Sequence, residues 1–323
     1  MQVNTLSVVR GQIVDRRVKL ESALDALGPR PELLQLLAEV DAALHRIDLG
    51  TYGLCETCHD PVEPDRLLAD PLARFCLDHL TPVEQRALEH DLELATRIQR
   101  GLLPDPAQAL DGWEFAYHYQ PARIVSGDYC DIVAADGATY FLLGDVSGKG
   151  VAASMLMSHL HAMVRALISV GLPLAALLER ASRVFCESTL PMHYATLVCG
   201  RATADGEVEI CNAGHVPPIV VRADGITLLE ATGLPVGMFS AGQFAPQRLR
   251  LAPGESVVLC SDGVTEAVDG DEREYGLDRL SAVVRDRHGL RVHDLVQSCV
   301  RDLTEHCSGP LQDDVTIMVV RRR

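Results

Sequence analysis

Three absences limit the classes to which this sequence can belong. We see no apolar run long enough to cross a bilayer, and the N-terminus, Met1-Gln-Val-Asn-Thr5, has no basic region followed by a hydrophobic one. Basic residues are scarce, with 29 Lys and Arg against 45 Asp and Glu and a formal net charge of −16. That balance disfavours nonspecific binding to DNA or to anionic membranes. We therefore expect a cytoplasmic protein that makes no direct contact with nucleic acid and none with a membrane.

A disulfide framework is also missing from the pattern. Of the ten cysteines, seven stand singly in apolar surroundings, which is typical of reduced thiols in a core. With 47% apolar residues the chain can bury a large core, and its 323 residues exceed what one compact core usually holds. The sequence therefore predicts two or more domains.

The most informative stretch runs from Tyr140 to Met155. An apolar run ends in Asp145 and is followed by glycines and a helix start of small residues, which predicts a buried strand that delivers Asp145 to a turn. Glycines at 144, 148 and 150 allow a ligand or metal to approach the main chain closely. A phosphate-binding P-loop is excluded, because three residues separate Gly144 from Gly148 and Gly150 follows Lys149.

Three further carboxylates stand at the ends of strand-like segments. They are Asp128 in Ser126-Gly-Asp128, Asp262 in Leu259-Cys-Ser-Asp-Gly263, and Asp313 in Gln312-Asp-Asp-Val-Thr316. Carboxylates gathered from separate strand ends repel one another unless cations hold them together, and hard oxygen ligands select Mg²⁺ or Mn²⁺. A single Asp-Gly turn is common in loops, but four aspartates at strand ends in this order indicate a metal centre.

From about Leu88 to Val320 the chain resembles the SpoIIE/RsbU-type branch of the metal-dependent PPM serine/threonine phosphatases. Six ordered motifs carry the resemblance: Leu94-Ala-Thr-Arg-Ile-Gln-Arg-Gly-Leu-Leu-Pro104, Ser126-Gly-Asp-Tyr-Cys-Asp131, Gly144-Asp-Val-Ser-Gly-Lys-Gly150, Asn212-Ala-Gly-His-Val-Pro-Pro218, Ser261-Asp-Gly-Val-Thr-Glu266 and Asp313-Asp-Val-Thr316. Strands grouped with separate helices already predict an α+β fold. The resemblance implies a PPM-type sandwich of two antiparallel β-sheets flanked by helices, with the metals at one end.

A two-metal mechanism is the expectation for this site. Two Mn²⁺ or Mg²⁺ ions would share a water, lower its pKa and present a metal-bound hydroxide in line with a phosphoryl group. We expect Asp145 to touch both metals beside the carbonyl of Val146, with Asp128, Asp262 and Asp313 completing the ligand set. These four aspartates are the predicted catalytic residues.

Other polar residues near these motifs have less certain roles. Asp131 and Asp314 each neighbour a better match and are candidates for supporting or turn positions. Arg123 and Lys149 are candidates for binding the substrate phosphate, and either Lys149 or a metal-bound water would protonate the serine oxygen. For His215 we favour a structural or rim role, because histidine is an uncommon ligand in Mg²⁺-type oxygen sites.

Residues 1 to 48 predict an antiparallel helical hairpin. Apolar residues repeat at helical spacing on both sides of Gly28-Pro-Arg-Pro31, which breaks the pattern. The first stripe is Leu6, Val9, Ile13, Leu20 and Leu27, and the second is Leu33, Leu37, Val40, Leu44 and Ile47. A dimerising coiled coil and a sensory module fit this hairpin equally well.

Two knuckles follow the hairpin and predict a structural zinc site. Cys55, Cys58, Cys76 and His79 form two C-x-x-[C/H] pairs separated by a loop, the spacing that closes a tetrahedral Zn²⁺ site. With the hairpin, the segment resembles the zinc finger of the DksA/TraR family, although His79 replaces a usual fourth cysteine and the hairpin tip lacks that family's acidic pattern. Cys55-Glu-Thr-Cys-His59 also matches a haem c attachment pattern, which would leave the second pair unused. His59 remains an alternative to His79 as the fourth ligand.

The chain therefore divides into four predicted parts. These are a helical hairpin at 1–49, a zinc finger at 50–81, a linker helix at 82–110 and a phosphatase domain at 111–323. In the linker, Leu88, Leu92, Ala95, Ile98 and Leu102 share a predicted apolar face that Pro104 ends. Hairpin turns are expected at Asp136-Gly137, Asp205-Gly206 and Asp224-Gly225, and helices at about 150–170, 173–188 and 276–306.

The leading hypothesis is a protein serine/threonine phosphatase regulated by its N-terminal zinc module. By resemblance, the substrate is a phosphorylated STAS-type anti-sigma-factor antagonist in a bacterial partner-switching pathway, and the helical segments form a homodimer. The competing hypothesis is a DksA-like transcription regulator that binds RNA polymerase and has a non-catalytic phosphatase fold. A small-molecule phosphomonoesterase is a third reading.

Overall fold

The computed structural model describes residues 3–63, 66–67, 70–80, 82–189 and 193–323. The chain divides into two compact units, Met1–Asp91 and Leu92–Arg323, which are described separately here. The division falls inside helix α4 (Pro82–Leu102), the helix that the sequence predicts as a linker.

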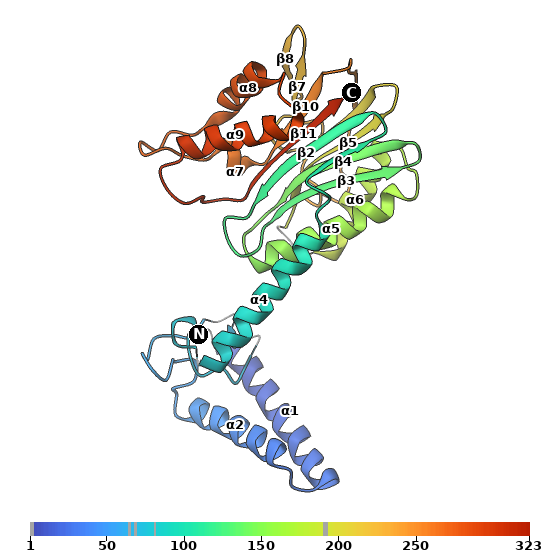
Figure 1. Ribbon diagram of the computed structural model, residues 1–323. Coiled ribbons are helices and arrows are strands. Elements are labelled where there is room, and N and C mark those ends of the chain that lie inside the picture. The colour runs from blue at the N-terminus through green and yellow to red at the C-terminus, as the bar shows by residue number, and fades with distance from the viewer. Residues whose placement is uncertain (1–2, 64–65, 68–69, 81, 190–192) are drawn as a thin grey trace. The chain divides into compact units, whose positions relative to one another are not determined.

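The Met1–Asp91 unit contains the predicted hairpin. Helix α1 (Val3–Leu27) and helix α2 (Pro31–Asp48) pack against each other, and the chain turns between them where the sequence predicts a break (Figure 1). Val9 and Ile13 of α1 and Val40 of α2 are buried, as the stripe pattern requires. Their cluster extends into the zinc-finger segment, which ends in the short 3₁₀ helix η1 (Leu77–His79). The side chains of Leu6 and Leu27 lie outside the described residues.

The Leu92–Arg323 unit is a sandwich of two antiparallel sheets, as predicted. One sheet has the order β1-β2-β11-β10-β7-β8 and the other β3-β4-β5-β6-β9. The strands are β1 (Ala107–Leu110), β2 (Trp113–Gln120), β3 (Asp128–Ala135), β4 (Ala138–Val146), β5 (Ala195–Thr203), β6 (Glu207–Ala213), β7 (Ile219–Arg222), β8 (Gly225–Leu228), β9 (Gln247–Arg250), β10 (Ser256–Cys260) and β11 (Val315–Arg322).

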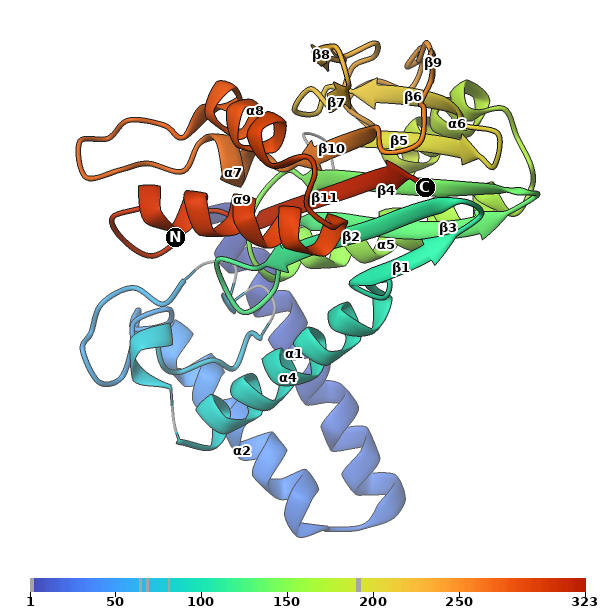
Figure 2. The same cartoon turned by 45° about the horizontal axis from the view of Figure 1, so that its top comes forward.

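Helices cover the outer face of each sheet. Figure 2 shows α5 and α6 along the β3-β4-β5-β6 sheet and α8 and α9 along the sheet that contains β11. These helices are α5 (Val151–Ile168), α6 (Leu174–Ser188), α7 (Asp262–Thr265), α8 (Gly276–Arg287) and α9 (Val292–His306).

The central strands are apolar on both faces because both faces are covered. In β4, Tyr140 and Leu142 pack in the cluster under α5 and α6, whereas Phe141 and Leu143 pack between the two sheets. Side chains alternate across a strand, so a continuous apolar run fills two cores at once. This explains why the segment before Asp145 reads as an unbroken hydrophobic run.

Hairpin turns lie at, or within one residue of, the three predicted places. Asp136 and Gly137 join β3 to β4 with φ of 50° and 70°, the left-handed pair that a two-residue type I′ turn requires. Asp205 and Gly206 lie in the turn from β5 to β6. The turn from β7 to β8 is Ala223-Asp224, one residue earlier than predicted, because Gly225 opens β8 opposite Arg222.

The structure refines three sequence expectations. The helical stretch at 276–306 is two helices, α8 and α9, separated by a turn that includes Gly289. In α4, Leu88 and Ile98 are exposed, and the buried position on the packed side is Gln99. Among the described residues, α5 has the length and the apolar composition that a membrane-spanning helix needs. Core helices of soluble proteins can have the same length and composition.

Candidate active site

The first two predicted ligands lie side by side on neighbouring strands. Asp128 opens β3 and Asp145 lies one residue before the end of β4, and the antiparallel register pairs them directly. Beyond Val146 the chain passes through Gly148 and Gly150, whose φ of 102° and 77° favour glycine. The loop then enters α5, so the predicted strand, turn and helix are all present.

The other two predicted ligands come from the second sheet. Asp262 begins α7 directly after β10, and Asp313 lies just before β11. Since β10 and β11 are antiparallel neighbours, with Cys260 opposite Ile317, the end of one strand lies beside the start of the other. Gly263 allows this approach, because a Cβ there would lie 2.1 Å from the carbonyl oxygen of Asp314.

Hydrogen bonds join the two sheets at this end. The hydroxyl of Thr316 donates to the Asp128 carboxylate, although the two residues are 188 positions apart. Asp314 accepts from the backbone N–H of Ala122 and of Gly127, both at 2.8 Å. Both Asp314 oxygens therefore hold the β2–β3 loop in place, which is the supporting role that the sequence left open for this residue.

Burial and mutual repulsion raise the pKa of three of the carboxyls. Burial and then the charge of Asp145 raise the pKa of Asp128, which is 1% exposed. Burial, followed by the charges of Asp262 and Asp313, raises the pKa of Asp145 to about 8. Burial and then Asp313 raise the pKa of Asp262. An arrangement of this kind favours a bound cation, since a cation removes the repulsion that protonation would otherwise relieve.

Lys149 offsets part of this negative charge. Its Nζ lies 2.7 Å from the Asp313 carboxylate and 3.2 Å from the carbonyl oxygen of Gln312. Among the residues described, it is the one cation that hydrogen-bonds to any of the four predicted ligands. The ion pair with Asp313 raises the pKa of Lys149, so the amine stays charged.

The donor set fits hard divalent cations. Four carboxylates, joined by the backbone carbonyl of Val146 at the end of β4, are oxygen donors of the kind that Mg²⁺ and Mn²⁺ prefer. Within the described ranges, the Cys–His cluster is the group of three or more donor atoms that lie within 4.8 Å of one another. The oxygens of the four aspartates are more widely spaced than that.

A cavity of about 530 Å³ opens beside Lys149 and Asp313. The residues after Asp262 and the loop before Asp313 form its walls. Glu266 lines it too, and burial followed by the charge of Asp262 raises its pKa. Glu266 ends the Ser261–Glu266 motif, and the sequence alone predicts no role for it.

Asp131 serves the fold rather than the ligand set. Its buried carboxylate accepts two hydrogen bonds from Arg165 of α5, each 2.8 Å long, and a third from the Tyr129 hydroxyl. His161 lies 3.6 Å from the same carboxylate. The ion pair therefore ties β3 to α5, and both Asp131 oxygens accept hydrogen bonds within these two elements.

Two further predicted residues have clear positions. His215 is buried, its Nδ1 lies 2.7 Å from the Thr196 hydroxyl, and burial lowers its pKa to about 4. This geometry supports a structural role and not a position at the rim. Arg123 is exposed on the β2–β3 loop and makes no ion pair within the part of the chain that is described.

Gln99 is a residue that the sequence reasoning missed. Its amide is buried and bonds to both backbone groups of Ser126, donating to the carbonyl at 2.7 Å and accepting from the N–H at 3.0 Å. It thereby fixes the segment that leads into Asp128. A polar side chain at helical spacing from Leu92, Ala95 and Leu102 was the available signal.

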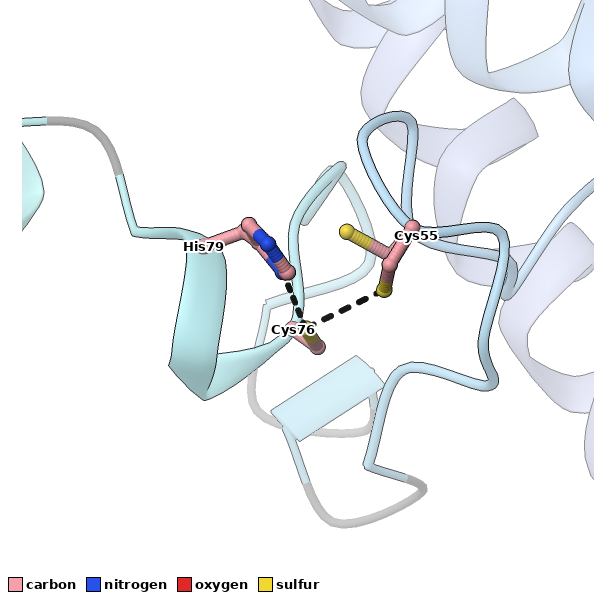
Figure 3. Close-up of side chains that lie close together, drawn as sticks. Cys55, Cys76 and His79 are labelled. Carbon is pink, nitrogen blue, oxygen red and sulfur yellow. Dashed lines mark hydrogen bonds between the residues drawn. The ribbon is translucent and has the colours of Figure 1, made fainter.

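The four residues that the sequence predicts as zinc ligands lie together in the Met1–Asp91 unit. Cys55, Cys58, Cys76 and His79 each offer a donor atom within 4.8 Å of the others. Cys58 Sγ lies 3.8 Å from Cys76 Sγ, close to the edge of a tetrahedron with Zn–S bonds of about 2.3 Å. Figure 3 shows the side chains of Cys55, Cys76 and His79 turned toward one another, with His79 Nδ1 3.2 Å from Cys76 Sγ. The cluster contains His79 and not His59.

Family profiles match both parts of the chain. The profile described as Stage II sporulation protein E (SpoIIE) matches residues 135–323, and the prokaryotic dksA/traR C4-type zinc finger matches residues 50–78. The second match ends just before His79, which stands where a C4-type finger has its fourth cysteine.

Curated relatives share the larger unit. Phosphoserine phosphatase RsbU of Bacillus subtilis is 26% identical over 245 residues, which cover 74% of this chain and 72% of RsbU. Protein IcfG of Synechocystis is 27% identical over 263 residues, 72% of this chain. The chain spans 41% of the length of IcfG.

Solved structures agree on the fold. The SiaA-PP2C domain of Pseudomonas aeruginosa has a TM-score of 0.67 at 19% identity, and it covers 76% of this chain and 100% of its own. The RsbU and RsbW domains of a Mycobacterium tuberculosis protein give 0.59 at 28% identity, over 68% of this chain and 63% of that one.

Proposed function

Because this chain belongs to the SpoIIE family, within the PPM-type phosphatases, we propose that it is a protein phosphatase that hydrolyses phosphoserine or phosphothreonine. One observation carries the proposal. Asp128, Asp145, Asp262 and Asp313 meet at one end of the sandwich although they come from both sheets. Gathering these charges costs stability, and a protein that served only as a scaffold would gain nothing from it.

The residues of the site have distinct roles in this proposal. Two Mn²⁺ or Mg²⁺ ions would supply the chemistry by lowering the pKa of an attacking water and offsetting the phosphoryl charge. Asp145 would contact both ions, beside the Val146 carbonyl, and the other three aspartates would complete the ligand set. Lys149 and Arg123 provide positive charge for a phosphoserine dianion, and Lys149 or water would protonate the departing serine oxygen.

The substrate class follows from the relatives. RsbU is named as a phosphoserine phosphatase, and the Mycobacterium tuberculosis protein joins RsbU and RsbW domains in one structure. These names support a partner-switching role, with a phosphorylated STAS-type anti-sigma-factor antagonist as the substrate. We place this reaction in the cytoplasm.

The N-terminal unit is the proposed regulator. One structural zinc ion would bind Cys55, Cys58, Cys76 and His79 and hold the finger against the hairpin. Leu88, Leu94 and Ile98 of α4 are 43%, 43% and 56% exposed, and a homodimer formed through helical segments would cover them.

Phosphate release from phosphoserine proteins tests the function. The native chain should release phosphate with Mn²⁺, and chelation should abolish the reaction. Asp145→Asn should lower the rate by about 10³-fold or more, because it removes the ligand shared by the ions. Asp286→Asn, a change in an exposed residue of α8, is the matched control. Metal-independent activity, or equal activity in Asp145→Asn, would contradict the two-metal assignment.

A second candidate function rests on the hairpin and finger. Their order matches a DksA-like regulator of RNA polymerase, in which the phosphatase fold would be a docking or oligomerising part. Copurification with polymerase, combined with no phosphatase activity even after removal of residues 1–81, would favour it. Hydrolysis of small phosphate monoesters but of no phosphoprotein would favour the small-molecule phosphomonoesterase.

A further inference from the structure

A groove of about 1020 Å³ lies in the Leu92–Arg323 unit, apart from the cavity beside Lys149. The last turns of α4 form one wall, the middle is formed by β2, and the β2–β3 loop and the start of α9 complete it. Tyr117 and Tyr119 line its floor, and the Tyr117 hydroxyl donates to the Pro104 carbonyl at 2.6 Å. The floor is therefore held in place by contacts within the unit.

The charge of this groove is opposite to that of the chain as a whole. Arg100 and Arg123 line it, both are exposed, and neither has a carboxylate within ion-pair distance in the described parts of the chain. Asp105 is the one acidic residue among the described lining residues. His118 adds no charge near neutral pH, since burial lowers its pKa. Although the protein has a net charge of −16, these two arginines beside the tyrosines should attract anions to the groove.

The groove lies next to the start of the strand that carries one predicted metal ligand. The Tyr119 hydroxyl of β2 donates to the backbone carbonyl of Asp128, the first residue of β3, at 3.4 Å. The loop that carries Arg123 leads directly into Asp128. The positive charge of Arg123 also lowers the pKa of Lys149, which opposes the larger effect of Asp313.

We propose that this groove binds an acidic segment next to the phosphoserine of the substrate protein, held by Arg100 and Arg123. The inference rests on the proposed phosphatase function and adds the chemistry of the substrate surface to it. A carboxylate-rich segment fits better than an apolar one, because the unpaired guanidiniums can form charge-assisted hydrogen bonds that an apolar segment would leave unmade.

Phosphopeptides of ten residues with one phosphoserine test this inference. One peptide carries Asp and Glu on both sides of the phosphoserine, and its matched partner carries Asn and Gln. With Mn²⁺ present, we expect kcat/KM for the acidic peptide to exceed that for the amide peptide by about fivefold to tenfold at low salt. The preference should shrink as ionic strength rises.

Charge reversal then assigns the preference to the groove. Arg100→Glu and the double variant with Arg123→Glu should bring the acidic-to-amide ratio to one or below, chiefly through KM for the acidic peptide. Arg183→Glu, an exposed arginine on α6 outside the groove, should keep the native ratio. A native ratio near one, or a preference that survives in the double variant, would overturn the inference.

Two other outcomes have separate meanings. If neither peptide nor p-nitrophenyl phosphate is hydrolysed with Mn²⁺, the phosphatase function itself fails and the inference fails with it. If the double variant turns a dimer into a monomer and leaves the peptide ratio unchanged, the groove binds a second copy of this chain and the inference is overturned.

Discussion

The two metal sites of this molecule are built in opposite ways. In the Met1–Asp91 unit all four ligands fall in the short stretch Cys55–His79, and two of them, Cys55 and Cys76, belong to the hydrophobic cluster itself. In the Leu92–Arg323 unit the four carboxylates stretch from Asp128 to Asp313 and stand at the ends of strands whose cores lie elsewhere.

The two units therefore differ in what stabilises their folds. Among the described residues the first unit has one small hydrophobic cluster, and we expect it to depend on a bound metal, because a fold of this size buries too little apolar surface by itself. The second has three clusters and holds its carboxylates together against their repulsion. We therefore expect a metal to organise the first unit, and the fold to organise the predicted metal site of the second.

The largest difference between the two units should appear when a predicted zinc ligand is lost. Cys76→Ser should abolish zinc binding and unfold the finger, since structural zinc contributes on the order of 10 kcal/mol of folding free energy. Zinc content and hydrogen exchange would measure the effect, with Cys186→Ser as the control for a cysteine outside the cluster. The phosphatase unit should keep its exchange protection. A finger that stays protected without zinc would contradict the dependence on metal.

Removal of Arg165 should reveal which carboxylates support the fold. Arg165→Met leaves the buried Asp131 carboxylate without its two guanidinium bonds, and we expect a loss of about 2–3 kcal/mol in the free energy of unfolding. Urea denaturation would measure it, with Arg183→Met as the control. An unchanged midpoint would mean that Asp131 is not held by this ion pair.

The stability of the metal-free phosphatase unit should fall as pH rises. The folded-state pKa of Asp145 is about 8, above its ordinary value near 4, so the folded protein retains a proton that the unfolded chain has lost between those values. Each pH unit in that window should cost at most about 1.4 kcal/mol. Melting temperatures in chelator at pH 5.5 and 8 would show the slope. Asp145→Asn should make it shallower and Mn²⁺ should oppose it, whereas an equal slope in the variant would rule Asp145 out as its source.

The smallest effect concerns the bond between the two sheets at the active site. Thr316→Val removes the hydroxyl that donates to Asp128 and should cost about 1 kcal/mol of stability. It should also weaken Mn²⁺ binding, because Asp128 loses its positioning partner. Thr304→Val, whose hydroxyl bonds only to a carbonyl of its own helix, is the control. Mn²⁺ titrations that give equal affinities for both variants would remove Thr316 from the site.

Local chemistry made the aspartates and the zinc ligands predictable. An acid after an apolar run, or two cysteines with two residues between them, can be recognised within a few positions. The same holds for the Asp-Gly turns of β3–β4 and β5–β6. The partners of those residues were not predictable in this way. Thr316 reaches Asp128 across 188 positions, and Gln99 looks like an ordinary polar residue of an amphipathic helix until the β2–β3 loop packs against it.

The burial of Gln99 in α4 has the same physical origin. Periodicity places Ile98 with Leu92 and Ala95, because hydrophobicity is the only property that the pattern weighs. In the structure the β2–β3 loop presents the backbone N–H and C=O of Ser126 to that side, and these groups need a polar partner. Gln99 satisfies both groups and is buried, and Ile98 faces outward.

The position of β11 has a consequence for biosynthesis. This strand follows every other described strand in the chain, yet it lies between β2 and β10 near the middle of its sheet. While the ribosome is still making it, β2 and β10 have unpaired edges facing each other, and Asp313 is not yet beside Asp262. Until β11 pairs with both neighbours, the edges of β2 and β10 are therefore open to the addition of another strand. Chaperones that shield sheet edges would have their greatest effect on the yield of this protein during that interval.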